Sequence, residues 1–125
     1  MNYTEWTFNG KSPIYIQLYQ KLKYGILSGQ LQPGESIPSI RQMADILRIN
    51  LNTVVRSYRL LHQDGLFVVP RGKQCSVISD SAFIQDKRNK EVKALCSNYV
   101  RTVMELGFTK EESMASIKEY CSYEK

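Results

Sequence analysis

Residues 37–66, IPSIRQMADILRINLNTVVRSYRLLHQDGL, carry the pattern of two helices separated by a short turn. Ser39 can cap the first helix with its hydroxyl, and Asn50 is a suitable cap for the second. Asp64 and Gly65 are typical of a helix end. The first helix places apolar residues at i, i+3, i+4 and i+7, namely Ile40, Met43, Ala44 and Leu47. Because only about three residues separate the two helices, the stretch predicts a helix-turn-helix.

The second helix of this pair has two chemically different faces. Its predicted core positions are Leu51, Val54, Tyr58 and Leu61. At about 100° per residue, the opposite side carries a narrow arc of polar side chains. The members of this polar arc are Asn52, Arg56, Arg59 and Gln63. The helix is therefore expected to turn one face to the core and the other to a partner.

A further helix is expected before this pair. Ser12 can cap a helix with its hydroxyl, and Pro13 suits the first helical turn. Apolar residues at four-residue spacing predict that this helix covers residues 12–29. These apolar residues are Ile14, Leu18, Leu22 and Ile26. Tyr15 and Tyr19 are expected to pack in the core or at its rim.

A β-hairpin is expected after the pair. Residues 66–70 and 74–78 have the composition of strands, and they enclose the basic turn Arg71-Gly72-Lys73. A hairpin directly after the second helix is what the wing of a winged helix-turn-helix looks like. The first part of the chain is therefore predicted to be a winged helix-turn-helix.

From residue 79 onwards the sequence reads as helix. An apolar stripe of near-heptad spacing consists of Val92, Leu95, Cys96, Tyr99, Val100, Val103 and Met104. Thr109 and Glu112 form the pattern of a capping box. The last helix carries Met114, Ile117 and Cys121 on one side. Two helices cannot enclose their own apolar faces, so the surplus must pack on the first domain or on another subunit.

The charge is divided unevenly along the chain of 125 residues. Residues 1–78 hold 9 Lys and Arg against 4 Asp and Glu, whereas residues 79–125 hold 8 against 8, so the first part carries the whole net charge of +5. A basic domain beside a neutral one favours a polyanion as the partner of the first. The chain is predicted to have two domains, residues 1–78 and residues 79–125.

Composition excludes several other classes of protein. With 42% hydrophobic and 23% charged residues, the chain has an ordinary globular balance. Neither a membrane-spanning run nor the basic-then-apolar order of a secretory signal is present, so we expect a cytoplasmic protein without a membrane partner. The three cysteines, Cys75, Cys96 and Cys121, are odd in number and widely spaced, which predicts reduced thiols and no metal site.

The polar arc suggests readers of DNA bases. Asparagine can pair with two atoms of adenine and arginine with two of guanine, and the start of a recognition helix is the part that reaches the major groove. Asn52, Thr53 and Arg56 are the candidates for base contacts. Arg41 could reach DNA at the groove, or could instead pair with Asp45 on the same helix. At the wing tip, Arg71 and Lys73 could contact phosphates or enter the minor groove, while Gly72 lets the backbone turn closely. A polar surface without DNA contacts is the alternative for the polar arc and the wing.

Catalysis finds no support in the sequence. His62 has no carboxylate or cysteine at ligand spacing, and a partly buried packing histidine is the expected role. No phosphate-binding glycine loop, His-Glu metal motif or nucleophile elbow is present. We expect no enzyme activity and no cofactor.

The chain resembles the DNA-binding domain of the GntR family of bacterial regulators. The resemblance is carried by residues 37–44, Asn52-Thr53-Val54, Tyr58, Leu61 and Asp64-Gly65-Leu66. The resemblance covers about residues 12–78. The short two-helix tail and Arg56-Ser57-Tyr58 look like the small YtrA-type subgroup, whose members dimerise through the tail. By this resemblance, DNA contacts fall on Arg41, Asn50, Asn52 and Thr53, and the wing glycine on Gly72.

The chain departs from the family pattern at several positions. Leu51 and Val55 stand where many members have DNA-contacting arginines, and Gln74 replaces a second wing glycine. Arg48 occupies a turn position that often holds glycine, so it either adds a phosphate contact or strains the turn. The operator is expected to differ from those of other members.

The resulting expectation is a mainly α fold with a small β-hairpin, in which a winged helix-turn-helix is followed by a two-helix dimerisation tail. The resemblance implies a homodimer that represses its own operon, often one for a transporter, from an inverted-repeat operator. The predicted dimer residues are Val92, Leu95, Tyr99, Val100, Val103, Met104, Met114 and Ile117. An effector of unknown identity would bind at the domain junction or dimer interface. The alternatives are a winged module that binds protein, and a small enzyme with a site at the tail junction.

Overall fold

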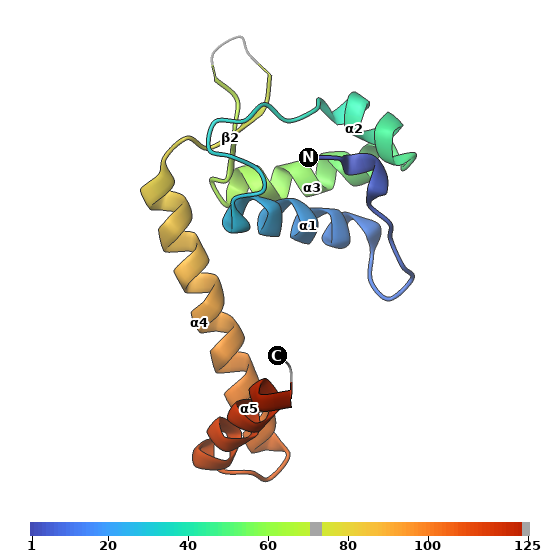
Figure 1. Ribbon diagram of the computed structural model, residues 1–125. Coiled ribbons are helices and arrows are strands. Elements are labelled where there is room, and N and C mark those ends of the chain that lie inside the picture. The colour runs from blue at the N-terminus through green and yellow to red at the C-terminus, as the bar shows by residue number, and fades with distance from the viewer. Residues whose placement is uncertain (71–73, 124–125) are drawn as a thin grey trace. The chain divides into compact units, whose positions relative to one another are not determined.

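The computed structural model describes residues 1–70 and 74–123 (Figure 1). Its elements are the 3-10 helix η1 (Tyr3–Glu5), the helices α1 (Ile14–Ser28), α2 (Ile40–Leu47) and α3 (Leu51–Gln63), the strands β1 (Phe67–Val68) and β2 (Ser76–Val77), and the helices α4 (Ser81–Glu105) and α5 (Lys110–Tyr123). The chain forms two compact units, Met1–Lys87 and Arg88–Lys125. The predicted class, mainly helical with a small β-hairpin, is confirmed.

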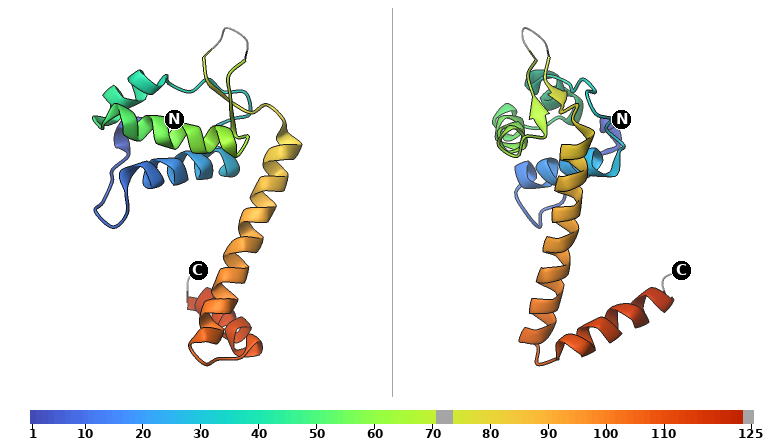
Figure 2. Two further views of the ribbon diagram at one scale, coloured as in Figure 1. Left: turned by 180° about the vertical axis from the view of Figure 1, so that it is seen from behind. Right: turned by 90° about the vertical axis from the view of Figure 1, so that its left-hand side faces the viewer.

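The core of the first unit lies where α1, α2 and α3 meet. Leu22 of α1, Met43 of α2 and Leu61 of α3 are all fully buried. Figure 2 shows α1 and α3 side by side, which places the predicted core faces of both helices against each other. Burying large apolar side chains of this kind contributes about 1.5 to 3 kcal/mol each, so these contacts hold the three helices together.

Three details of the predicted helices were wrong. Pro13 rather than Ser12 precedes α1, without any side-chain cap, and the carbonyl of Ser12 accepts a hydrogen bond from the Gln17 side chain instead (2.7 Å). Leu51 and Ile14 are exposed, at 43% and 39%, although their spacing predicted burial. Each is the first residue of its helix, and helical side chains lean toward the N-terminus, which carries these two past the end of the core.

Both helices of the helix-turn-helix begin at their predicted caps. Ser39 and Gln42 form a reciprocal capping box at the start of α2, and the side chain of Asn50 caps α3. Arg48 ends α2 in the left-handed conformation, with φ of 54°. Only glycine adopts that region without steric cost, so the strained turn suggested by the sequence is present at this residue.

The hairpin strands are shorter than predicted. They pair antiparallel, with Phe67 opposite Val77 and Val68 opposite Ser76. β2 turns its other edge to the segment before α2, since the Val77 N–H donates to the carbonyl of Glu35 (2.9 Å) and the Ile37 N–H donates to that of Cys75 (2.9 Å). This pairing joins the base of the hairpin to the chain that leads into α2.

The second unit is a helical corner. Gly107, with φ of 97°, follows the end of α4, and the predicted capping box of Thr109 and Glu112 starts α5. The hydroxyl of Tyr99 on α4 donates to the carbonyl of Ser113 on α5 (2.9 Å).

Among the residues that the structure describes, none of the helices has both the length and the apolar character that crossing a membrane requires.

Candidate nucleic-acid interface

The start of α3 is fixed by the side chain of Asn50. Its Oδ1 accepts a hydrogen bond from the backbone N–H of Asn52 (2.8 Å). The cap uses the amide oxygen, so the N–H₂ group of Asn50 keeps two donors for a partner. Asn52 is exposed and Thr53 is half-buried. The residues predicted to contact DNA here lie at the surface, and their role in DNA binding stays a prediction.

The two faces of α3 are as different as their sequence predicted, apart from Leu51. All four residues of the polar arc, Asn52, Arg56, Arg59 and Gln63, are exposed. On the opposite side Val54, Ser57 and Leu61 are fully buried. The core thus fixes the orientation of the helix and leaves the polar arc open to a partner.

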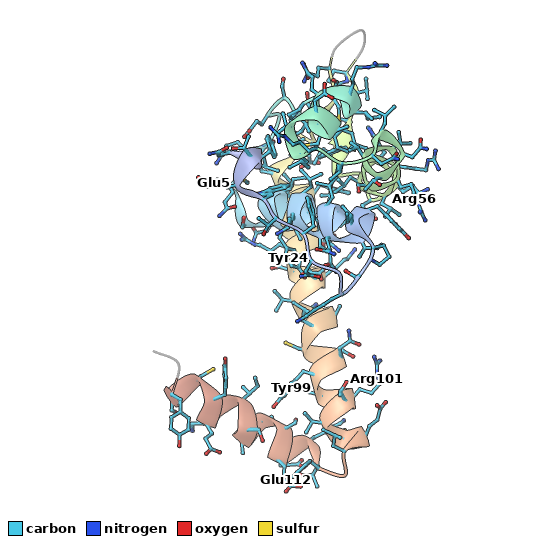
Figure 3. All side chains as sticks on the ribbon, turned by 90° about the vertical axis from the view of Figure 1, so that its right-hand side faces the viewer. Glu5, Tyr24, Arg56, Tyr99, Arg101 and Glu112 are labelled. Carbon is cyan, nitrogen blue, oxygen red and sulfur yellow. The ribbon has the colours of Figure 1, made fainter. Side chains whose placement is uncertain are left out.

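Arg56 makes a contact that the sequence did not reveal. Its guanidinium carbon lies 3.8 Å from the centre of the Tyr15 ring, which comes from the first turn of α1. Figure 3 shows Arg56 at the outer side of α3. The two residues are far apart in sequence and no local spacing links them, so only the packing of α1 on α3 brings them together.

The structure describes Arg41 but not the predicted DNA contacts of the wing. Arg41 is exposed near the start of α2. Arg71, Gly72 and Lys73, the predicted wing contacts, lie outside the described residues.

Leu51, which the sequence assigned to the core, is instead an exposed apolar side chain at the start of α3. In this place it can meet the methyl group of a thymine.

His62 and Cys75 show no sign of catalytic chemistry. His62 is exposed rather than partly buried, and its ring is in edge-to-face contact with Phe67 (centroids 5.9 Å apart). Its Nε2 lies 3.9 Å from the sulfur of Cys75. Burial raises the pKa of the Cys75 thiol to about 11, whereas a nucleophilic cysteine needs a lowered pKa. Within residues 1–70 and 74–123, no group of three His, Cys, Asp or Glu side chains is placed to hold a metal.

The second unit exposes the apolar residues of α4 and α5. Leu95 is 53% exposed on α4, and Met114 and Ile117 are 69% and 45% exposed on α5. A hollow of about 410 Å³ between the two helices is lined by Leu95, Cys96, Tyr99, Val100, Ser113, Met114 and Ile117. Of the predicted dimer residues, Tyr99, Val100 and Val103 are half-buried and Val92 and Met104 are exposed. A surface of this composition is typical of a protein contact.

A helix-turn-helix with an outward polar arc, followed by a β-hairpin within a basic segment, defines the class of DNA-binding transcriptional regulators. The model "Bacterial regulatory proteins, gntR family" matches residues 14–77, and the chain belongs to this family. The homologues of the chain and its fold are those of DNA-binding transcription factors and not of enzymes.

Relatives and a solved structure agree with the family. The "Uncharacterized HTH-type transcriptional regulator YhcF" of Bacillus subtilis is 29% identical over 113 residues, which cover 90% of this chain and 93% of YhcF. The "HTH-type transcriptional repressor YtrA" of the same organism is 38% identical over 71 residues, which cover 57% of this chain and 54% of YtrA. A solved GntR family transcriptional regulator from Listeria monocytogenes has a TM-score of 0.79 at 28% identity, covering 90% of this chain and 98% of that one.

Proposed function

We propose that the chain is a cytoplasmic repressor that binds an inverted-repeat operator as a homodimer. Residues 1–78 would bind the DNA, and residues 79–125 would join the two subunits. The observation that carries the proposal is the polar arc of α3, whose four residues are all exposed on a helix that is packed on the core and capped by Asn50. A rigid helix with amide and guanidinium donors at its surface suits the major groove.

The DNA contacts fall into two groups by their chemistry. Asn52, Thr53 and Arg56 read base edges from α3, together with the amide of Asn50. Arg41, Arg71 and Lys73 contact phosphates, which give affinity without sequence preference, while Gly72 lets the backbone of the wing turn closely. Phosphate contacts also release counterions, so operator affinity falls steeply as salt is added.

The apolar surface of α4 and α5 supports the proposed dimer. Side chains such as Leu95 and Ile117 remain exposed within their own unit and carry no charge that would keep them in water. A second copy of the same surface covers them, with Val92, Tyr99, Val100, Val103, Met104 and Met114 in the contact. Two recognition helices related by a twofold axis then reach half-sites about one helical turn apart.

Repression and the regulated genes form the finer part of the proposal. YtrA, a relative over half of this chain, is named a transcriptional repressor. We extend that role to this protein, with a transporter operon as the target. Transcription from its own promoter, measured with and without the protein, should fall when the protein is added; a rise would contradict repression.

A selection of duplexes from a random pool tests the DNA-binding proposal. We expect the selected sequences to share two inverted half-sites whose centres lie about one helical turn apart. A selected motif without inverted symmetry would contradict the twofold arrangement. No enrichment at all would favour the alternative, a winged module that binds protein.

A further inference from the structure

Tyr15 and Arg56 form a stacked pair on the side of the first unit that carries the polar arc. The guanidinium carbon of Arg56 lies 3.8 Å from the centre of the Tyr15 ring, a distance at which the two groups are in face contact. Tyr15 is half-buried and Arg56 is exposed, so the ring forms a platform under a side chain that would otherwise move freely.

The platform is itself held in place. The hydroxyl of Ser57, the residue after Arg56, donates a hydrogen bond to the backbone carbonyl of Tyr15 (2.7 Å). Ser57 is fully buried between α1 and α3. This bond fixes the backbone of Tyr15 beside the α3 turn from which Arg56 extends, so the ring and the guanidinium meet in a defined place.

Stacking leaves the hydrogen-bonding groups of the arginine free. A guanidinium contacts a ring through its flat face, while its five N–H donors lie in the plane and point outward. Arg56 can therefore stay on Tyr15 and still donate two parallel hydrogen bonds to a guanine edge or a phosphate. Holding the side chain before DNA arrives reduces the conformational entropy that binding would otherwise cost.

The pair is distinctive among the cations of the helix-turn-helix. Arg41 and Arg59 are both exposed, and within residues 1–70 and 74–123 neither has an aromatic ring beneath it. Elsewhere in the described part of the chain, Lys23 lies over the Tyr19 ring and Lys87 over the Phe83 ring. Of the three arginines compared, only Arg56 is thus held in advance.

We propose that Tyr15 is a positioning residue for DNA recognition, which holds Arg56 in the orientation that contacts the operator. The inference rests on the proposed function, because it assumes that Arg56 touches DNA. It adds that α1, outside the helix-turn-helix, takes part in specificity.

A double-mutant cycle tests the proposal. Affinity for a duplex selected by the wild-type protein is measured for Tyr15→Leu, Arg56→Ala and the double variant. We expect Tyr15→Leu to weaken binding about two- to fivefold, the range of an exposed cation–ring contact, and to have no further effect beside Arg56→Ala. Tyr15→Phe keeps the ring face and should retain binding, while Tyr24→Leu, which changes an exposed tyrosine of the same helix, is the matched control.

The outcomes separate the inference from the function on which it rests. An Arg56→Ala variant with unchanged affinity would remove Arg56 from the interface, and with it the need for a platform. A loss with Arg56→Ala but none with Tyr15→Leu would overturn the positioning role alone. So would an equal loss from Tyr15→Leu in both backgrounds, since that pattern indicates a structural effect.

A second measurement needs neither DNA nor a stable Tyr15→Leu variant. The ring current of Tyr15 should shift the NMR signals of the Arg56 side chain in the free protein. Arg59, which has no ring beneath it, serves as the internal reference. Arg56 and Arg59 signals at the same random-coil position would show that the stacked pair is absent in solution and would refute the proposal.

Discussion

The hydroxyl of Tyr58 on α3 donates a hydrogen bond to the backbone carbonyl of Pro38, 2.7 Å away, just before α2 begins. Tyr58 is 3% exposed, and burial raises the pKa of its hydroxyl. This bond therefore joins α3 to the segment that leads into α2. It helps to set the distance between Arg41 on α2 and the polar arc on α3.

Tyr58→Phe should destabilise the protein by about 1 to 2 kcal/mol. The phenylalanine ring can keep the edge-on contact with Phe67 (centroids 5.0 Å apart), but the carbonyl of Pro38 loses its donor. Chemical denaturation of the two proteins gives the difference directly. An unchanged midpoint and slope would mean that water replaces the hydroxyl without cost.

Tyr3→Phe should have the opposite effect. The hydroxyl of Tyr3 is buried and has no hydrogen-bond partner among the described residues, and burial together with the nearby Glu35 carboxylate raises its pKa to about 12. An unpartnered buried hydroxyl costs about 1 to 3 kcal/mol, so its removal should raise the free energy of unfolding. The ring should still pack on Trp6. A Tyr3→Phe variant that unfolds more easily would show that the hydroxyl does have a partner in solution.

Local signals in the sequence predicted much of the first unit. The caps at Ser39 and Asn50, the helix end at Gly65 and the apolar spacing of α2 and α3 each depend on residues within a few positions of one another. Such signals give the angle of a residue around its helix. They do not say how far the core reaches along the helix axis, which is why Leu51 was wrongly assigned to the core.

Contacts between distant segments were beyond the sequence. The stack of Arg56 on Tyr15 depends on how α1 crosses α3, and no periodicity encodes that crossing. The exposure of His62 has the same origin, since its neighbours Phe67 and Cys75 both come from the segment that follows α3. The hairpin strands were predicted too long because composition does not reveal which residues find a pairing partner. The site roles of the polar arc stay predictions, to be tested as follows.

Asn52→Ala should lower discrimination between operator and random DNA by about 1 to 3 kcal/mol, the range for loss of a two-bond base contact. Arg56→Ala should do the same at a different base position. The measurement is the ratio of affinities for a selected duplex and a scrambled one at fixed salt. Equal losses on both duplexes would identify the residue as a phosphate contact instead.

Gln20→Ala is the control for this series. Gln20 is exposed on α1, outside the polar arc, and its replacement should leave both affinities as they are. The alternative function, a winged module that binds protein, predicts no difference between the two duplexes for any variant, including the wild type.

Leu95→Glu should produce monomers. Leu95 is 53% exposed within its own unit, so the substitution should leave the fold intact while placing a charge in the proposed dimer contact. Sedimentation should show half the wild-type mass, and operator affinity should fall because two half-sites are no longer bound together. Ala94→Glu, on an exposed neighbouring position of α4, is the matched control and should remain dimeric. A dimeric Leu95→Glu protein with normal affinity would place the subunit contact elsewhere.

Arg48→Gly should stabilise the protein and weaken DNA binding at once. The left-handed conformation of Arg48 (φ 54°) costs a side-chain-bearing residue about 1 to 2 kcal/mol. Glycine removes that cost but has more freedom in the unfolded chain, so the net gain in unfolding free energy should be about 1 kcal/mol or less.

Arg48 is exposed in the turn just before α3, and we expect it to contact a phosphate. Its loss should reduce the slope of log affinity against log salt by about one. Stabilisation with an unchanged slope would leave Arg48 as a strained turn residue without a DNA contact, and an unchanged stability would show that the turn relaxes around arginine.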